Sequence, residues 1–228
     1  MKNFTRRLAL GFLLLSCAAL ARAAEDSPKT AAAPPVTLVE NDYVRVQEFR
    51  SQPGEKSPMH SHPGSFLVYA FTKVSGRMTT ADGKVTEEKL KKGSVTFNEP
   101  VKHEVENTGA KEAHVLVVDL KKEVGSKAPK GEDPVKLDPT GYKVLLENDR
   151  VRVLEARIKP GTEIGMHAHP AAVLYAFNAF KVQFTLSDGT KQEIDQEAGK
   201  ARWLEPVLHS HKQIGDKTAH LLLFELKK

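Results

Sequence analysis

The sequence has almost no cysteine and no hydrophobic run long enough to cross a membrane. Its 228 residues contain one cysteine, Cys17, and the apolar run that surrounds it covers only residues 8–20. A membrane-spanning helix needs about 20 apolar residues, so this run is too short to span a bilayer comfortably. Beyond position 17 the chain has no disulfide, no thiolate metal ligand and no cysteine nucleophile.

Residues 1–23 have the pattern of a secretory signal peptide. Lys2, Arg6 and Arg7 precede the apolar run, and Ala21-Arg22-Ala23 supplies the small residues that a signal peptidase reads. We therefore expect an exported protein, periplasmic or secreted, whose mature chain starts near position 24 and has no transmembrane span. Residues 24–37 are rich in alanine and proline, which favours a flexible N-terminal segment ahead of the fold.

Two alternatives to a cleaved signal peptide remain open. The apolar run is compatible with a short anchor that is not removed. In addition, Leu14-Leu15-Ser16-Cys17 loosely resembles a bacterial lipoprotein box, in which Cys17 would carry lipid.

An excess of charge is also missing once this segment is set aside. The whole chain has 34 basic and 29 acidic residues, and residues 1–23 contain four of the basic ones and none of the acidic ones. Cleavage thus leaves 34 − 4 = 30 basic residues against 29 acidic ones. A nearly neutral mature chain gives no reason to expect a nucleic-acid partner.

An internal repeat divides the remaining chain into two units. Residues 39–63 read VENDYVRVQEFRSQPGEKSPMHSHP and residues 146–170 read LENDRVRVLEARIKPGTEIGMHAHP, with 14 of 25 positions identical. The similarity continues, after a one-residue deletion, to His103 and His209. A unit of this length is too long for a solenoid repeat and predicts a duplicated domain. We expect domains at residues 38–120 and 142–228, joined by a linker at 121–141.

Each unit has the pattern of short β-strands. Tyr43-Val44-Arg45-Val46 alternates apolar and polar residues, and Pro53-Gly54 and Asp82-Gly83 are typical of turns between strands. Neither unit contains an amphipathic helical stretch of ten or more residues. The sequence therefore predicts an all-β protein built from sandwiches or barrels.

All nine histidines lie inside the two units, and six of them form two equivalent sets. His60 and His62 are two residues apart where a strand should begin, so their side chains share one face. His103 follows about 40 residues later, and the second unit repeats the pattern with His167, His169 and His209. Three neutral imidazoles suit a divalent metal and leave coordination positions for a ligand. We expect metal affinity to fall as pH drops through about 6.5, where free histidine protonates.

This pattern resembles the cupin superfamily. The first cupin motif is glycine, five residues, His-x-His, and then a glutamate, and Gly54 and Gly161 precede the two His-x-His pairs at that spacing. The second motif is similar to Gly93, His103 and Asn107, with its proline displaced by one residue. The resemblance implies two tandem cupin-type barrels, each a double-stranded β-helix or jelly roll, that is, a bicupin.

The motif glutamate is missing in both units. Its place falls at Phe66 or Leu67 in the first unit and at Val173 or Leu174 in the second, and all four are apolar. Bicupins that process oxalate use that glutamate with manganese, and carboxylates suit manganese better than imidazole does. The resemblance therefore favours iron, zinc, nickel or copper over manganese.

Three further histidines have no assigned role. His114 and His220 begin apolar strands at equivalent positions, and His211 shares a strand face with His209. Asp119 is the polar residue of its strand, so we expect its face to point outward and His114 to point into the barrel. A histidine on an apolar face is usually a structural residue, and orienting a metal ligand is the alternative.

The resemblance implies a metal-dependent oxygenase that acts on a small organic molecule. A periplasmic module that binds a small ligand without catalysis is the first alternative. A metal-dependent isomerase or lyase is the second, because a bound metal can act as a Lewis acid. The sequence identifies neither a catalytic residue nor the substrate.

Overall fold

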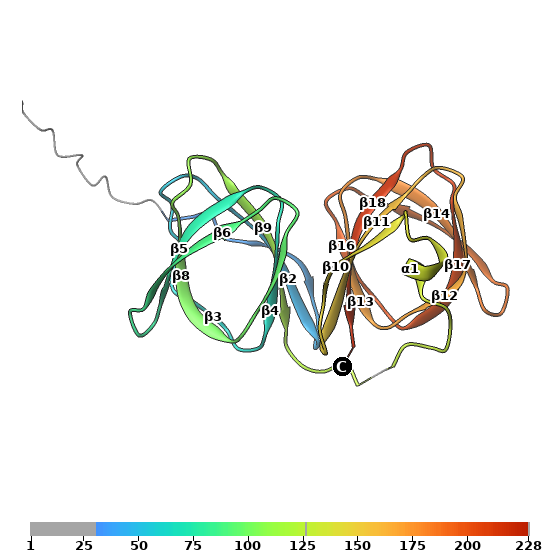
Figure 1. Cartoon of the computed structure of the whole chain (residues 1–228), viewed down its shortest axis with the longest axis horizontal. Helices are drawn as coiled ribbons and strands as arrows, with labels where there is room; N and C mark the ends of the chain where they lie inside the picture. The colour runs from blue at the N-terminus through green and yellow to red at the C-terminus, as the bar shows by residue number, and fades with distance from the viewer. Residues whose placement is uncertain (1–30, 126, 228) are drawn as a thin grey trace, which may run out of the picture.

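The computed structural model describes residues 31–125 and 127–227, in which strands form two barrels joined by a connecting segment (Figure 1). The predicted all-β class and the tandem pair of cupin-type barrels are confirmed. The predicted signal peptide, including Cys17, lies outside the described residues. No helix in the described part of the chain is long and apolar enough to cross a membrane.

The first barrel consists of two antiparallel sheets. One has the strand order β1-β2-β9-β4-β7 and the other β3-β8-β5-β6. The strands are β1 (Val36–Glu40), β2 (Val44–Ser51), β3 (His60–His62), β4 (Phe66–Ala70), β5 (Val74–Thr80), β6 (Val85–Leu90), β7 (Val95–Asn98), β8 (Val101–Asn107) and β9 (Ala113–Leu120). Gly83, with a φ of 85°, lies in the predicted turn between β5 and β6, where a residue without Cβ is favoured.

The second barrel repeats this topology strand for strand. Its sheets have the orders β10-β11-β18-β13-β16 and β12-β17-β14-β15, which are the first two orders with nine added to each number. The strands are β10 (Tyr142–Glu147), β11 (Val151–Ile158), β12 (Glu163–His169), β13 (Ala172–Ala176), β14 (Phe180–Leu186), β15 (Lys191–Gln196), β16 (Ala201–Leu204), β17 (Val207–Gln213) and β18 (Ala219–Leu226).

The connecting segment packs on the second barrel. Its one helix, α1 (Pro134–Leu137), starts at Asp133, whose side chain accepts a hydrogen bond of 3.0 Å from the backbone N–H of Val135. Just before it, the backbone N–H of Ala168 donates to the carbonyl of Glu132 at 3.0 Å. The segment therefore continues along β12, the strand that carries His167 and His169.

The five-stranded sheets of the two barrels face each other, and a shared hydrophobic core fills the space between them (Figure 1). In β9 the residues Leu116, Val118 and Leu120 belong to this shared core. Aromatic rings cross the interface, with Tyr43 stacked on Trp203 at a centroid distance of 5.5 Å. Each five-stranded sheet is thus covered on both faces, by its own barrel interior and by the other barrel.

This arrangement overturns one sequence expectation. Asp119 was expected to point outward, but it points into the first barrel, where it contacts His62. The apolar residues that alternate with it face the other barrel instead. His114 lies on their side of the sheet, where its Nε2 is 2.7 Å from a carboxylate oxygen of Glu48. The reason is that successive residues of a strand face opposite sides, and here the more apolar side covers a domain interface.

Candidate metal centres

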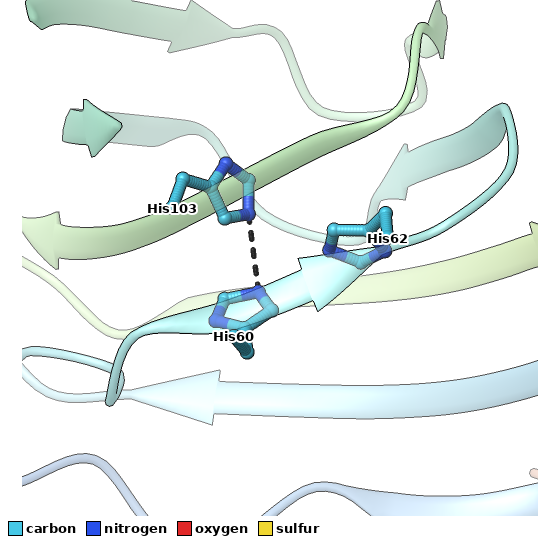
Figure 2. Close-up of side chains that lie close together, drawn as sticks. All are labelled: His60, His62 and His103. Atoms are coloured by element: carbon cyan, nitrogen blue, oxygen red, sulfur yellow. Dashed lines mark hydrogen bonds between the residues drawn. The ribbon is translucent and has the colours of Figure 1, made fainter. Parts of the chain in front are cut away.

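The first histidine trio comes from two paired strands. His60 and His62 lie on β3, and His103 lies on β8, directly opposite His60. The Nε2 atoms of His60 and His103 are 3.1 Å apart (Figure 2). Nitrogen atoms of all three rings lie within 4.8 Å of one another. The structure therefore brings together the three histidines that the sequence pattern selected in this barrel.

The second trio has the same construction. His167 on β12 lies opposite His209 on β17, and their Nε2 atoms are also 3.1 Å apart. His169 completes a group whose nitrogens lie within 4.8 Å of one another. In the described part of the chain, the groups of side chains at metal-ligand spacing contain histidines alone.

The ring orientations fit metal binding. Nδ1 of His60 lies 2.9 Å from the carbonyl of Pro58, and Nδ1 of His167 lies 2.7 Å from the carbonyl of Gly165. A carbonyl only accepts, so Nδ1 carries the proton in both rings and Nε2 keeps its lone pair for a metal. A separation of 3.1 Å is close to the roughly 3 Å expected for two nitrogens in adjacent positions about 2.1 Å from one ion.

A buried carboxylate orients the remaining histidine of each trio. Nδ1 of His62 is 2.5 Å from Asp119, and Nδ1 of His169 is 2.6 Å from Glu225. Such a contact fixes the tautomer, raises the basicity of the ligand nitrogen and turns Nε2 toward the site. The sequence analysis missed both carboxylates. Their signal was an acidic residue at the same place in each repeat, inside an otherwise apolar strand.

Each of these carboxylates is also paired with an arginine. Asp119 accepts from Nε of Arg45 at 2.8 Å, and Glu225 accepts from Nε of Arg152 at 2.5 Å. Burial alone would raise the pKa of both acids, but the hydrogen bonds from histidine and arginine outweigh it, so both pKa values lie below their ordinary range. The two carboxylates are therefore ionised at neutral pH.

Burial favours the neutral form of four of the ligand imidazoles. It lowers the pKa of His103 and of His167 to about 4, and that of His209 to about 2. It also lowers the pKa of His60. Neutral imidazole is the form that binds metal, so these four rings keep their metal-binding form below the pH at which free histidine protonates.

The two sites differ in their surroundings. In the first barrel the ring of Phe66 stacks on His62, with a centroid distance of 3.9 Å and an interplanar angle of 16°. The equivalent residue of the second barrel is Ala172. There, His169 and His209 border a cavity of about 60 Å³. The second trio therefore adjoins space for a ligand.

The positions where the sequence pattern places the missing glutamate face different ways. Phe66 covers His62, and Leu174 lines the cavity of the second barrel. Leu67 and Val173 belong to the core between the barrels. Inside each barrel, an apolar side chain, Phe66 or Leu174, therefore takes the place of the motif glutamate.

The three histidines without an assigned role fall into two classes. His114 and His220 lie at the interface side of their sheets, where each imidazole is 2.7 Å from a glutamate of its own barrel, Glu48 or Glu155. They lie outside the trios. His211 lines the cavity of the second barrel, with its ring centroid 5.2 Å from that of His167.

Comparison with known proteins identifies the fold. Residues 47–119 match the family of cupin domains. Oxalate decarboxylase from Bacillus subtilis superposes with a TM-score of 0.61 and 14% identity, over 84% of this chain and 71% of that one. Another structure of the same enzyme, studied for its Mn(II) centres, has a TM-score of 0.61 and 15% identity over the same shares. At such identity the likeness shows the fold alone.

Two further comparisons add little to this. A cupin domain from Bordetella pertussis Tohama I is 26% identical over 42% of this chain and all of that one, with a TM-score of 0.39. A search of curated proteins finds no match. The Mn(II) centres belong to the oxalate decarboxylase structure, and the comparisons do not disfavour manganese.

Proposed function

Because the chain is a protein of two cupin barrels, we propose that it is a metal-dependent oxygenase whose second barrel acts on a small organic molecule. One observation carries this proposal: the second histidine trio borders a cavity. Three protein ligands leave coordination positions open, and here those positions adjoin space that a substrate can enter. A mononuclear site held by histidines suits iron, and an Fe(II) ion there would supply O₂ binding and activation.

The residues around the second trio have separate tasks in this mechanism. Glu225 holds His169 in one orientation through a hydrogen bond of 2.6 Å, and Arg152 holds Glu225 by donating to it at 2.5 Å. The apolar side chains of the cavity, among them Leu221 and Leu223, exclude water and contact the carbon skeleton of the substrate. His211 lines the same cavity, where burial lowers its pKa to about 3, so it is a neutral imidazole that can form a hydrogen bond with a substrate.

Oxygen uptake tests this proposal. The full chain, loaded with Fe(II), is to be mixed with a panel of small thiols, diketones and carboxylic acids while dissolved O₂ is recorded. We expect uptake with at least one compound, and none for a His167→Ala/His169→Ala variant, whereas the matched His60→Ala/His62→Ala variant keeps it. Uptake that is equal in both double variants would contradict the assignment to the second barrel.

Two other functions have specific support and give different results in the same assay. The fold of oxalate decarboxylase supports a lyase or isomerase, which would turn over substrate with no O₂ consumed. The first barrel, where Phe66 covers His62, supports a site that binds metal without chemistry. If neither barrel turns over any compound, the chain is a ligand-binding module.

We also propose that the chain is exported with residues 1–23 removed. The basic start, the apolar run and Ala21-Arg22-Ala23 support this. Mass spectrometry of the protein recovered outside the cytoplasm should find an N-terminus near Ala24. An intact N-terminus, or lipid on Cys17, would overturn it.

A further inference from the structure

The cavity of the second barrel is lined mostly by apolar side chains but also by one arginine. Arg202 lies on β16, opposite Leu174 of β13, and both side chains line the cavity. Its strand neighbours Ala201 and Trp203 pack into the core between the barrels. The alternation of a strand therefore directs Arg202 into the second barrel.

Arg202 has no acidic partner there. Its Nε atom is buried and has no hydrogen-bond partner among the described residues. Burial lowers its pKa, and no nearby carboxylate opposes that effect. By contrast Arg152, in the same barrel, is bonded to both Glu225 and Asp133. The side chain is partly buried, and a buried Nε–H without a partner is costly, so this place favours a hydrogen-bond acceptor.

The first barrel has no such feature. The residue equivalent to Arg202 is Thr96, which lies opposite Val68 in the same register. The residue equivalent to His211 is Val105. His211 has a buried Nδ1 without a hydrogen-bond partner in the described residues, and its side chain lines the cavity. Among the described residues, Arg202, His211 and Gln213 each bring an unpartnered buried atom to the cavity beside the second trio, whereas at the first trio the unpartnered atom is Nδ1 of His103, itself a member of the trio.

We propose that the second barrel binds a small organic carboxylate, whose carboxylate pairs with Arg202 and whose carbon skeleton contacts the apolar wall. This rests on the proposed function and names its substrate class. Arginine pairs with carboxylate through two parallel N–H···O bonds, which supplies both energy and orientation. A cavity of about 60 Å³, at roughly 10–15 Å³ for each water-sized group, holds a molecule of about four to six non-hydrogen atoms.

Binding to the zinc-loaded full chain tests the proposal, because zinc does not react with O₂. Acetate, propionate and butyrate are to be titrated by calorimetry, with butyramide as an uncharged molecule of the size of butyrate. We expect at least one of the acids to bind with one equivalent per chain, and butyramide to bind about tenfold more weakly or not at all. A preference for charge would show that a cation, either Arg202 or the metal, holds the carboxylate, and the Arg202 variants separate the two.

Variants locate the site. Arg202→Gln should weaken acid binding by about 10- to 100-fold, the usual effect of losing a charge-assisted pair. Arg202→Lys keeps the charge but not the paired N–H groups, so its affinity for the acid should lie between those of the unaltered chain and Arg202→Gln. The matched control is Arg77→Gln, because Arg77 is exposed on the first barrel and pairs with Glu87 at 2.9 Å. Metal content and thermal melting confirm that each variant is folded.

The outcomes separate this inference from the proposed function. If none of the three acids binds, if butyramide binds as well as butyrate, or if both Arg202 variants bind like the unaltered chain, the inference is wrong. Acid binding that depends on Arg202, together with an absence of O₂ uptake, would leave the inference standing and refute the oxygenase. O₂ uptake that is unaffected by Arg202→Gln would refute the inference and leave the oxygenase.

Discussion

The two barrels share a strand order and a histidine trio but differ in what surrounds the trio. In the first barrel Phe66 stacks on His62, and the ring of Phe49 lies 6.4 Å from that of His60. The equivalent residues of the second barrel are Ala156 and Ala172. In the second barrel Phe184 stacks on His209 instead, at a centroid distance of 4.6 Å, and a cavity borders the site.

The second site is also more enclosed by its own chain. His167 is completely buried, and the connecting segment runs beside it, with Glu132 bonded to the backbone of Ala168. His60, its counterpart, is partly exposed. The comparison teaches that the trio itself does not determine the use of a barrel. The side chains around it decide whether a ligand can reach the metal.

The largest expected effect comes from removing the metal ligands of each barrel in turn. We expect half of the bound metal to be lost in His60→Ala/His62→Ala, and also in His167→Ala/His169→Ala. Each of these variants removes two of the three ligands from one barrel and leaves the other barrel intact. Metal content by atomic absorption measures this. Full metal content in either double variant would show that the corresponding trio is not the site.

The packing around the first site gives the next largest effect. Phe66→Ala should destabilise the chain by about 3–5 kcal/mol, since it removes a buried ring and leaves a cavity beside His62. Urea unfolding measures the loss. Val85→Ala, at an exposed strand position of the same barrel, is the control and should change stability by less than about 0.5 kcal/mol. Equal effects of the two would show that Phe66 does not hold the first site together.

The carboxylates that orient the trios should affect only their own barrels. Asp119→Asn should weaken metal binding at the first site by about 10- to 100-fold, and Glu225→Gln should do so at the second. Both changes remove the ionised acceptor of a histidine N–H. Competitive titration with a chelator resolves the two sites. The control is Glu87→Gln, at an exposed ion pair, which should leave the metal affinity of both sites unchanged. If Asp119→Asn or Glu225→Gln alone weakened metal binding at both sites, the two barrels would be coupled.

The smallest expected difference is in the response to acid. A proton competes with the metal for each ligand nitrogen, and a ligand with a lower pKa is protonated only at a lower pH. The pKa of His209 is about 2, whereas that of its counterpart His103 is about 4. As pH falls through about 4, the first barrel should therefore release its metal before the second. Metal content after gel filtration at successive pH values checks the order, and the reverse order would contradict it.

The sequence could indicate the His-x-His pairs because their geometry is local. A spacing of two residues places His60 and His62 on one strand face, whatever the rest of the fold does. The repeat then supplied the same pattern with His167, His169 and His209. His103 and His209 meet their pairs only through the long-range pairing of β3 with β8 and of β12 with β17, so the sequence could indicate them only through the repeat and the family resemblance.

The residues that surround the trios, Asp119 and Arg202 among them, could not be predicted from local sequence patterns. Asp119 was placed on the wrong face because an apolar strand face normally marks the inside of a domain. Here the face with Leu116 and Val118 covers the second barrel, so both faces of the sheet are buried and hydrophobicity no longer distinguishes them. Arg202 was missed for a similar reason, since no local pattern shows that its strand faces a cavity.

The contacts between the barrels have a consequence for how the molecule behaves when dilute. Tyr69 contacts Phe177 at a centroid distance of 5.7 Å, and Phe71 contacts Tyr175 at 5.2 Å. These are the reciprocal contacts of a symmetric dimer, in which each patch meets its own counterpart. Because the connecting segment joins the halves, their effective concentration is fixed by that tether, in the millimolar range for a short flexible one. Dilution therefore does not separate them, and neither half needs to find a partner in order to cover its apolar sheet.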